Sequence, residues 1–256
     1  MPENDLALLI AAARRAGEIA MGYVGKRFEV ITKPQDNSPV TEADLAVNAM
    51  LDETLRAARP DYGWLSEESA DSPARLTARR VFVIDPIDGT RSFVAGDDTW
   101  AHSLAVVQDG VPLAAVVYLP MKDQLYSAIQ GGGAALNGAP ITASDAHDLA
   151  SARVLTTKPN LDPRHWRSAV PDLRRSHRPS VAYRLSLVAE GRYDAMFTFR
   201  PSWEWDIAAG ALLVTEAGAV ITDRSGAPLS FNAPHPQVSG VVAATPALHA
   251  EILARL

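Results

Sequence analysis

The stretch that decides the fold is Val81–Thr90, with the sequence VFVIDPIDGT. Its first four residues are apolar and either β-branched or aromatic, which predicts a buried strand. Asp85 and Asp88 follow that strand at its carboxyl end, where open α/β sheets place their ligands. Pro86 restricts the backbone between them, so both carboxylates can face one point in space without helical spacing. The stretch therefore predicts two hard oxygen ligands at one edge of a sheet.

The next two residues suit an anion. Gly89 permits a tight turn, and Thr90 can open a helix whose first N–H groups favour a phosphate. Two carboxylates beside such a turn are typical of a Mg2+ site for phosphoryl chemistry. Two acids at this spacing also occur on ordinary surface turns, so the interpretation depends on the rest of the chain.

Composition narrows the class of protein. The chain has 256 residues, a formal net charge of -6 and no cysteine, which excludes disulfides, thiolate metal sites and cysteine nucleophiles. The negative charge argues against a nucleic-acid polymer as partner. The amino terminus carries no basic and apolar leader, and no apolar run is long enough to cross a bilayer. We expect a cytoplasmic protein that binds no membrane.

Periodicity predicts an α/β protein with α+β character in its N-terminal half. There we expect a helix capped by Asn4 or Asp5 that runs to Val24, and a loop over residues 33–40. A second helix should be capped by Thr41, with Asp44 completing a capping box. The predicted strands of this half are 81–84, 100–107, 111–119 and 125–129, with a hairpin turn at Asp109-Gly110.

The pattern changes beyond Asp145 to alternating strands and helices. The predicted elements are strands at 154–157, 220–222 and 241–244 and helices at 163–170, 183–190, 206–217 and from Pro246 onward. We therefore expect two closely packed parts, residues 1–145 and 146–256, with a soft boundary between them.

Three further acidic segments accompany Val81–Thr90. Glu67 and Glu68 follow the apolar Gly63–Leu65, Asp44 lies on the first turn of a predicted helix, and Asp206 lies in the sequence WEWDIAAG of residues 203–210. Taken singly, each acid is explained by surface charge or helix capping. Their order along the chain, together with Phe93, resembles the inositol monophosphatase superfamily of Mg2+-dependent, lithium-sensitive phosphatases. The resemblance implies a layered αβαβα sandwich, shared with fructose-1,6-bisphosphatases.

The resemblance also implies the metal ligands. A first Mg2+ would be held by Glu67, Asp85 and the backbone carbonyl of Ile87. A second would be held by Asp85, Asp88 and Asp206, and a third, looser ion would share Glu67. Two to three ions per site are therefore expected, and Mg2+ does prefer such oxygen ligands. Ser66 departs from the family, which usually has Gly before the acidic pair.

The implied mechanism is in-line attack by water without a phosphoenzyme. Thr90, oriented by Asp44, would help to activate the water, with Glu67 beside it. Backbone N–H groups of Gly89 and Thr90 would hold the phosphate, and Asp88 and Asp206 would also face the substrate. The six histidines form no recognisable triad with a serine, so a serine hydrolase is not expected.

The phosphate ester is predicted from Phe197–Pro201, with the sequence FTFRP. Inositol-hydrolysing relatives carry a Glu seven residues before the last metal Asp, and no Glu stands there in this chain. Arg200 can grip a second phosphate, and Phe197 and Phe199 can stack on a base. The region resembles bacterial 3'(2'),5'-bisphosphate nucleotidases, which convert adenosine 3',5'-bisphosphate to AMP.

Other interpretations remain open. Arg200 can cap a loop while the two phenylalanines lie in the core. Inositol-1-monophosphatase is the next candidate, followed by histidinol-phosphate or sugar phosphatase. A non-catalytic regulatory module with this fold would be expected to lose a metal carboxylate, and none is lost. The partners expected are a small phosphate ester and, by family resemblance, a second copy of the chain in a homodimer.

Overall fold

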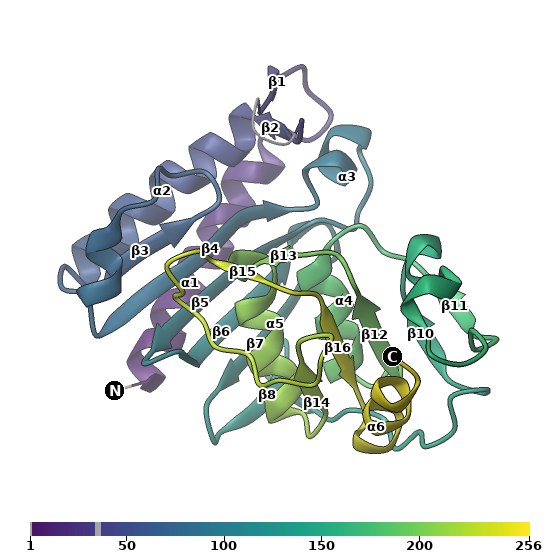
Figure 1. Ribbon diagram of the computed structural model, residues 1–256. Coiled ribbons are helices and arrows are strands. Elements are labelled where there is room, and N and C mark those ends of the chain that lie inside the picture. Colours follow the sequence, from purple (N-terminus) through teal and green to yellow (C-terminus); the bar gives the residue numbers. More distant parts are fainter. Residues whose placement is uncertain (1, 34–36) are drawn as a thin grey trace.

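The computed structural model describes residues 2–33 and 37–256 (Figure 1). Helices α1 and α2 cover one face of a seven-stranded sheet, and helices α4 and α5 cover the other. The far side of α4 and α5 packs on a five-stranded sheet, whose outer face carries α6. The layers thus run helices, sheet, helices, sheet, helix, which confirms the expected αβαβα sandwich.

The first layer consists of α1 (Pro2–Met21) and α2 (Glu42–Ala58). The predicted capping box is confirmed, because the Thr41 hydroxyl accepts from the N–H of Asp44 and the Asp44 carboxylate accepts from the N–H of Thr41. The predicted cap of α1 is wrong, since Asp5 lies inside the helix. Its buried carboxylate accepts hydrogen bonds from the side chains of Arg59, Tyr62 and Arg80.

The seven-stranded sheet follows the chain order and is antiparallel except for its first pair. Its strands are β3 (Gly63–Ser66), β4 (Arg80–Asp88), β5 (Ala101–Gln108), β6 (Val111–Leu119), β7 (Gln124–Ile129), β8 (Gly133–Leu136) and β9 (Ala139–Ile141). Asp109 and Gly110 both have positive φ, at 52° and 83°, as a tight hairpin between right-twisted strands requires. The predicted hairpin is confirmed.

Strand β4, which lies between β3 and β5 in the sheet, is buried on both faces. Val81 and Val83 pack toward α4 and α5, whereas Phe82 and Ile84 pack toward α1 and α2. This explains the continuous apolar run, because both faces of the strand lie in a core.

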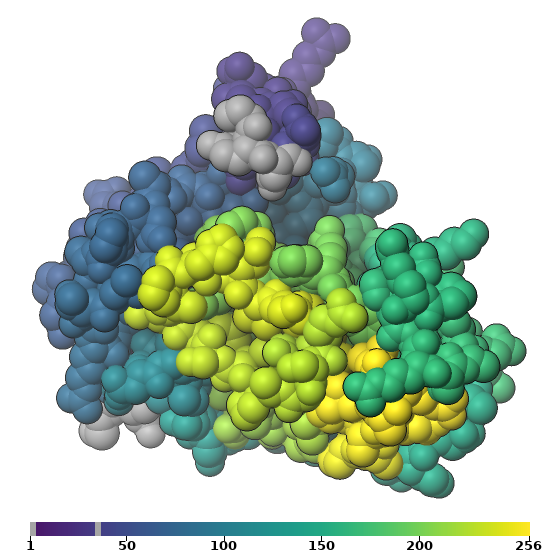
Figure 2. Space-filling model, viewed as in Figure 1, coloured from purple at the N-terminus to yellow at the C-terminus, as the bar shows by residue number. Residues whose placement is uncertain are grey.

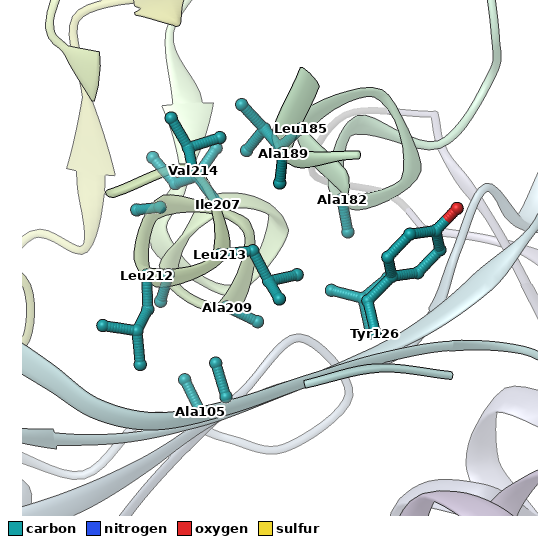
Figure 3. Packing of buried hydrophobic residues seen from close by; sticks show 14 of the residues in the cluster. Ala105, Tyr126, Ala182, Leu185, Ala189, Ile207, Ala209, Leu212, Leu213 and Val214 are labelled. Atoms are coloured by element: carbon teal, nitrogen blue, oxygen red, sulfur yellow. The ribbon is translucent and has the colours of Figure 1, made fainter. Parts of the chain in front are cut away.

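The C-terminal sheet has the order β11-β10-β12-β16-β14 and is mixed. Its strands are β11 (Arg174–Ser176), β10 (Arg153–Leu155), β12 (Ala195–Thr198), β16 (Val241–Ala244) and β14 (Val220–Thr222). The helices are α4 (Val181–Ala189), α5 (Glu204–Glu216) and α6 (Pro246–Arg255). Helices α4 and α5 pack closely (Figure 3), because a Cβ on Gly210 would lie only 2.5 Å from the Leu185 side chain.

The remaining elements are short. They are β1 (Val30–Thr32), β2 (Pro39–Thr41), α3 (Thr90–Ala95), β13 (Ser202–Trp203), β15 (Gln237–Val238) and 3-10 turns at Pro73–Thr77, Pro120–Lys122, Lys158–Leu161 and Pro163–His165. The β1–β2 hairpin replaces part of the predicted loop, of which residues 34–36 lie outside the described residues.

Several predicted bounds differ from the structure, among them the end of α1, which is Met21 and not Val24. The predicted helix 163–170 is a single 3-10 turn, since Pro171 follows closely and the N–H of Arg167 bonds instead to Arg255. Helix α5 begins at Glu204, two residues before the predicted start, so Asp206 is its third residue. Strand β12 was not predicted. Among the described residues, no helix is long and apolar enough to span a bilayer.

Candidate active site

A cavity of about 530 Å³ opens at the carboxyl end of β4, where elements of both halves meet. It collects eight of the nine predicted site residues, Glu67, Asp85, Ile87, Asp88, Gly89, Thr90, Arg200 and Asp206. The ninth, Asp44, lies behind Thr90 and hydrogen-bonds to it. Strand β4 therefore also lines the cavity, with Asp85, Ile87 and Asp88.

A bulge in β4 turns its two aspartates toward this cavity. The pairing of β4 with β5 shifts register between Asp85 and Asp88. The N–H of Ile87 donates to Asp85 Oδ1 at 3.0 Å, and the carbonyl of Pro86, displaced from the ladder, accepts from the buried ring of His102. These bonds satisfy groups that a bulge would otherwise leave unpaired.

Three carboxylates converge at the centre of the site. Glu67 at the end of β3, Asp85 in β4 and Asp206 in α5 each place an oxygen so that all three oxygens lie within 4.8 Å of one another. Burial raises the pKa of Asp85 and of Asp206 well above the usual value, and neighbouring carboxylates raise both further. Converging hard oxygen donors with mutual repulsion fit a divalent cation such as Mg2+.

Asp88 connects this cluster to α4. Its Oδ2 accepts hydrogen bonds from the hydroxyl of Ser180, at 2.7 Å, and the N–H of Ala182, at 2.6 Å. Burial raises the pKa of Asp88 to about 6, although these two hydrogen bonds oppose the shift. The start of α4 therefore fixes the orientation of a carboxylate that β4 supplies.

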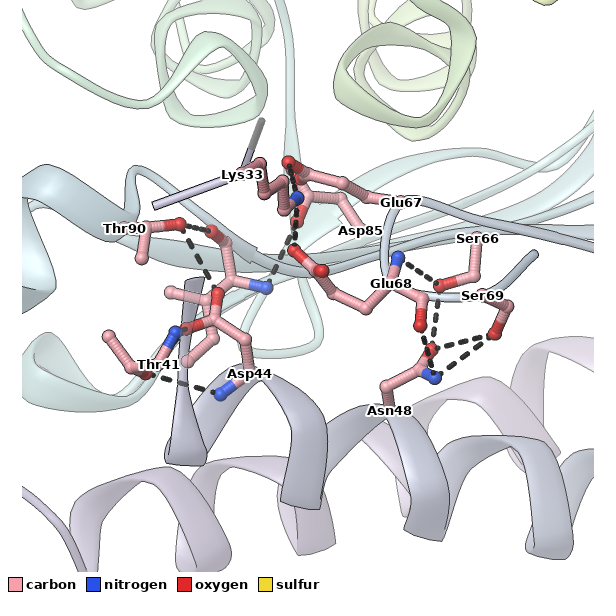
Figure 4. Close-up of polar contacts among 11 residues, drawn as sticks. Lys33, Thr41, Asp44, Asn48, Ser66, Glu67, Glu68, Ser69, Asp85 and Thr90 are labelled. Atoms are coloured by element: carbon pink, nitrogen blue, oxygen red, sulfur yellow. Dashed lines mark hydrogen bonds and ion pairs between the residues drawn. The ribbon is translucent and has the colours of Figure 1, made fainter. Parts of the chain in front are cut away.

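Thr90 and Asp44 form the other predicted pair (Figure 4). The Thr90 hydroxyl lies 3.2 Å from both Asp44 Oδ1 and the carbonyl oxygen of Ile87. Asp44 is held in turn by the backbone and side chain of Thr41. Burial raises the pKa of Asp44 to about 6. The capping box of α2 thus orients a carboxylate that reaches the active-site threonine.

Lys33 was not predicted as a site residue. Its Nζ lies 2.8 Å from Glu67 Oε1 and 2.6 Å from Glu68 Oε1 (Figure 4). Burial alone would lower the pKa of Lys33, but the two glutamates outweigh it and raise that pKa. A lysine in a polar loop gives no sequence signal of this contact. Ser66, the departure from the family pattern, hydrogen-bonds Asn48 at 2.7 Å and the N–H of Glu68.

The opposite wall of the cavity is cationic. Arg184 is only 2% exposed, and its Nη1 has no hydrogen-bond partner among the described residues. Burial lowers the pKa of Arg184 to about 10. Arg200 is exposed and lines the same wall, together with His177. Sequence reasoning missed Arg184, although a charge inside the apolar run VAYRLSLVA was a usable signal.

The predicted stacking role of two phenylalanines is wrong. Phe197 and Phe199 are buried in the core beneath α6, stacked on each other at 5.1 Å and edge-on to Trp166. Two tryptophans line the cavity instead, Trp203 and Trp205, whose rings stack at 4.8 Å.

Comparisons with known proteins agree with this geometry. The family model described as the inositol monophosphatase family matches residues 1–256. Inositol monophosphatase 1 of Solanum lycopersicum is 34% identical, over 88% of this chain and 86% of that protein. Nus factor SuhB of Salmonella typhimurium is 35% identical, over 86% of this chain and 85% of that protein. The solved structure of an IMPase from Thermotoga maritima superposes with a TM-score of 0.85 at 28% identity, covering 99% of this chain and 96% of that one.

Proposed function

Because the chain belongs to the inositol monophosphatase family, a family of phosphatases, we propose that it hydrolyses a small phosphate monoester that carries a second anionic group. Glu67, Asp85 and the carbonyl of Ile87 would hold one Mg2+. Asp88 and Asp206 would join Asp85 around another. When bound, Mg2+ supplies neutralisation of the phosphate charge and activation of water.

The protein's own groups would orient the reactants. The Thr90 hydroxyl, held by Asp44 and facing the cavity, would accept a hydrogen bond from the attacking water and pass its own proton toward Asp44. The N–H groups of Gly89 and Thr90 would bind the phosphate that reacts. No side chain is assigned as a covalent nucleophile.

The observation that carries the choice of substrate is the buried Nη1 of Arg184, which has no hydrogen-bond partner among the described residues, whereas Nε donates to the carbonyl of Ser180 at 3.3 Å. A buried cationic donor without an acceptor is costly, so the cavity favours a ligand that supplies an anion there. Arg200 on the same wall can add a second fork of donors. A 3'(2'),5'-bisphosphate nucleotide fits this wall with one phosphate and the metal site with the other, and Trp203 offers its base an aromatic surface.

A second observation argues against an inositol ring. Of the described residues that line the cavity, the only carboxylates are Glu67, Asp85, Asp88 and Asp206, all of them in the proposed metal set. No further acid remains to hold ring hydroxyls, and Thr198 is one of the neutral residues there. Inositol 1-phosphate is nevertheless the second candidate, because relatives named inositol monophosphatase match most of the chain.

A phosphate-release screen with Mg2+ tests the proposal. The substrates are adenosine 3',5'-bisphosphate, inositol 1-phosphate, histidinol phosphate and fructose 1,6-bisphosphate. The nucleotide should give the highest kcat/KM. Arg184→Met and Arg200→Ala should each raise KM for the nucleotide by roughly ten- to a hundredfold, the effect of losing a charged hydrogen bond. KM for inositol 1-phosphate should barely change.

Arg164→Ala serves as the control, because Arg164 is an exposed arginine whose side chain pairs with Asp162. It should leave both substrates unaffected. The nucleotidase assignment would be replaced by inositol monophosphatase if the wild type preferred inositol 1-phosphate. The same would hold if Arg184→Met and Arg200→Ala raised KM for both substrates equally.

Two properties follow from the family alone. Lithium should inhibit at millimolar concentrations, which an assay in LiCl with a KCl control would measure. The chain should form a homodimer, which light scattering after size exclusion would show as twice the 27.4 kDa chain mass. A monomeric protein that lithium does not inhibit could still be a hydrolase, but it would be a less typical member of the family.

A further inference from the structure

Glu204 is a fully buried carboxylate two residues before Asp206. Its side chain is 0% exposed and accepts the N–H of Asn232 at 2.5 Å and the N–H of Ala233 at 3.0 Å. A buried acid is retained only where hydrogen bonds compensate its desolvation. The first turn of α5 is therefore fastened to the segment Asn232–Ala233.

Arg75 fastens the same segment from the other side. It is 2% exposed, donates from Nη1 to Asn232 Oδ1 at 2.6 Å and from Nη2 to the carbonyl of Ala233 at 2.9 Å. Asp71 holds the guanidinium in place with bonds of 2.6 and 2.9 Å. Asn232 adopts a left-handed φ of 65°. Its N–H donates to Glu204, while its side-chain oxygen accepts from Arg75. We call Arg75, Glu204 and Asn232–Ala233 the brace.

The brace joins the two parts of the molecule that supply the carboxylate cluster. Arg75 lies in the connection between β3 and β4, beside Gly63 at the start of β3. Glu67 directly follows β3, and Asp85 lies in the last part of β4. Glu204 lies in the helix that carries Asp206. In the space-filling view, yellow C-terminal residues lie directly against blue residues of the N-terminal half (Figure 2).

We propose that Glu204 and Arg75 are positioning residues, which set the distance from Asp206 to Glu67 and Asp85. Three carboxylates with oxygens within 4.8 Å of one another repel, and this repulsion acts to push α5 away from the strand ends. The brace opposes that movement with four hydrogen bonds to a single two-residue segment. The inference rests on the proposed metal role of the cluster.

The test measures binding of Mn2+ to the purified, metal-free protein, with free Mn2+ followed by electron paramagnetic resonance. Glu204→Gln keeps the size of the side chain but turns an amide donor toward a backbone N–H. It should weaken Mn2+ binding by about tenfold or more, as expected for the loss of charged hydrogen bonds. Asn232→Gly keeps the left-handed backbone and the N–H that Glu204 accepts, and it removes both side-chain hydrogen bonds between Asn232 and Arg75. It should weaken Mn2+ binding roughly two- to tenfold.

Asp5→Asn is the matched control. Asp5 is also a buried carboxylate with several partners, but one of them is Arg80, at the opposite end of β4 from Asp85. It should lower the melting temperature as much as Glu204→Gln does and leave Mn2+ affinity unchanged. If Glu204→Gln fails to fold, Asn232→Gly carries the test with the same control.

The outcomes separate this inference from the proposed function. Wild-type protein that binds no Mn2+ would overturn the metal site itself. Wild-type binding combined with unchanged affinity in both brace variants would overturn only the positioning role. Equal weakening by Asp5→Asn would also overturn it, because the effect would then be one of general stability.

Discussion

Thr90 donates its hydroxyl to Asp44 at 3.2 Å across 46 positions of sequence. Asp44 belongs to the capping box of α2, so a local helix-start motif also serves a distant residue. The pair ties the first turn of a helix to the turn that follows β4. If the two residues act as a unit in the reaction, their substitutions should not have additive effects on rate.

Thr90→Ala and Asp44→Asn should each lower kcat by about a hundred- to ten-thousandfold, the range of general acid–base assistance. The double variant should be little slower than either single one. Steady-state kinetics at saturating Mg2+ would measure all three. Additive losses would show that the threonine and the aspartate act separately.

Asp85→Asn should abolish measurable turnover and leave the fold intact. Asp85 is proposed to contact both metal positions, so losing its charge should weaken both, and each is worth several kcal/mol in such sites. Circular dichroism would confirm the fold, and activity would be assayed at rising Mg2+. Asp123→Asn, a change at an exposed residue, is the control. Near-normal activity of Asp85→Asn at high Mg2+ would contradict the two-metal arrangement.

His102 should make stability depend on pH in a defined direction. Burial lowers its pKa from 6.5 to about 4, so the folded protein disfavours the proton that the unfolded chain takes up. Its contribution is complete above pH 6.5 and is lost as the pH falls toward 4. Between pH 7 and pH 5 the loss is about 2 kcal/mol by linkage.

Urea unfolding of wild type and His102→Asn at both pH values would isolate this contribution. The asparagine amide can still donate to the carbonyl of Pro86 but does not titrate in this range. The difference in unfolding free energy between the two proteins should therefore shrink from pH 7 to pH 5. A constant difference would mean that His102 does not carry this dependence.

The carboxylate cluster should act in the opposite direction in metal-free protein. Burial raises the pKa of Asp88 to about 6 and raises that of Asp85 well above its usual value, so both lie above their unfolded values. The stability that these groups contribute is present at low pH and is lost as the pH rises through their folded pKa values. Added Mg2+ should therefore raise the melting temperature more at pH 8 than at pH 5.5, where it must displace protons. An equal rise at both would argue against binding at the cluster.

Most of the features that were predicted correctly depend on residues that are neighbours in the sequence. The apolar run before Asp85, the capping box at Thr41 and the Asp109-Gly110 turn depend on neighbours in sequence, and each is confirmed. Arg200 was expected at the cavity from its place before Asp206, and it lies there. These features need no knowledge of the tertiary structure.

The misses depended on tertiary contacts. Lys33 contacts Glu67 only because the paired strands β1 and β2 lie beside the site. The separation of the two residues in the sequence does not predict that contact. Phe197 and Phe199 are residues of a type that can stack on a base, yet both are buried in the core beneath α6. Asp5 is of a residue type that often caps helices, but its carboxylate accepts hydrogen bonds from distant side chains instead. Residue type was informative in each case, and position in space was decisive.

Helices α4 and α5 have a consequence for the synthesis of the chain. They cover one face of the seven-stranded sheet across β4 to β8, but they lie after it in the sequence, and α5 is complete only at Glu216. A nascent chain that has emerged only through β9 would present that apolar face bare to the cell. We therefore expect ribosome-bound chains of this length to recruit chaperones, and that recruitment should fall sharply once residues 181–216 have left the exit tunnel.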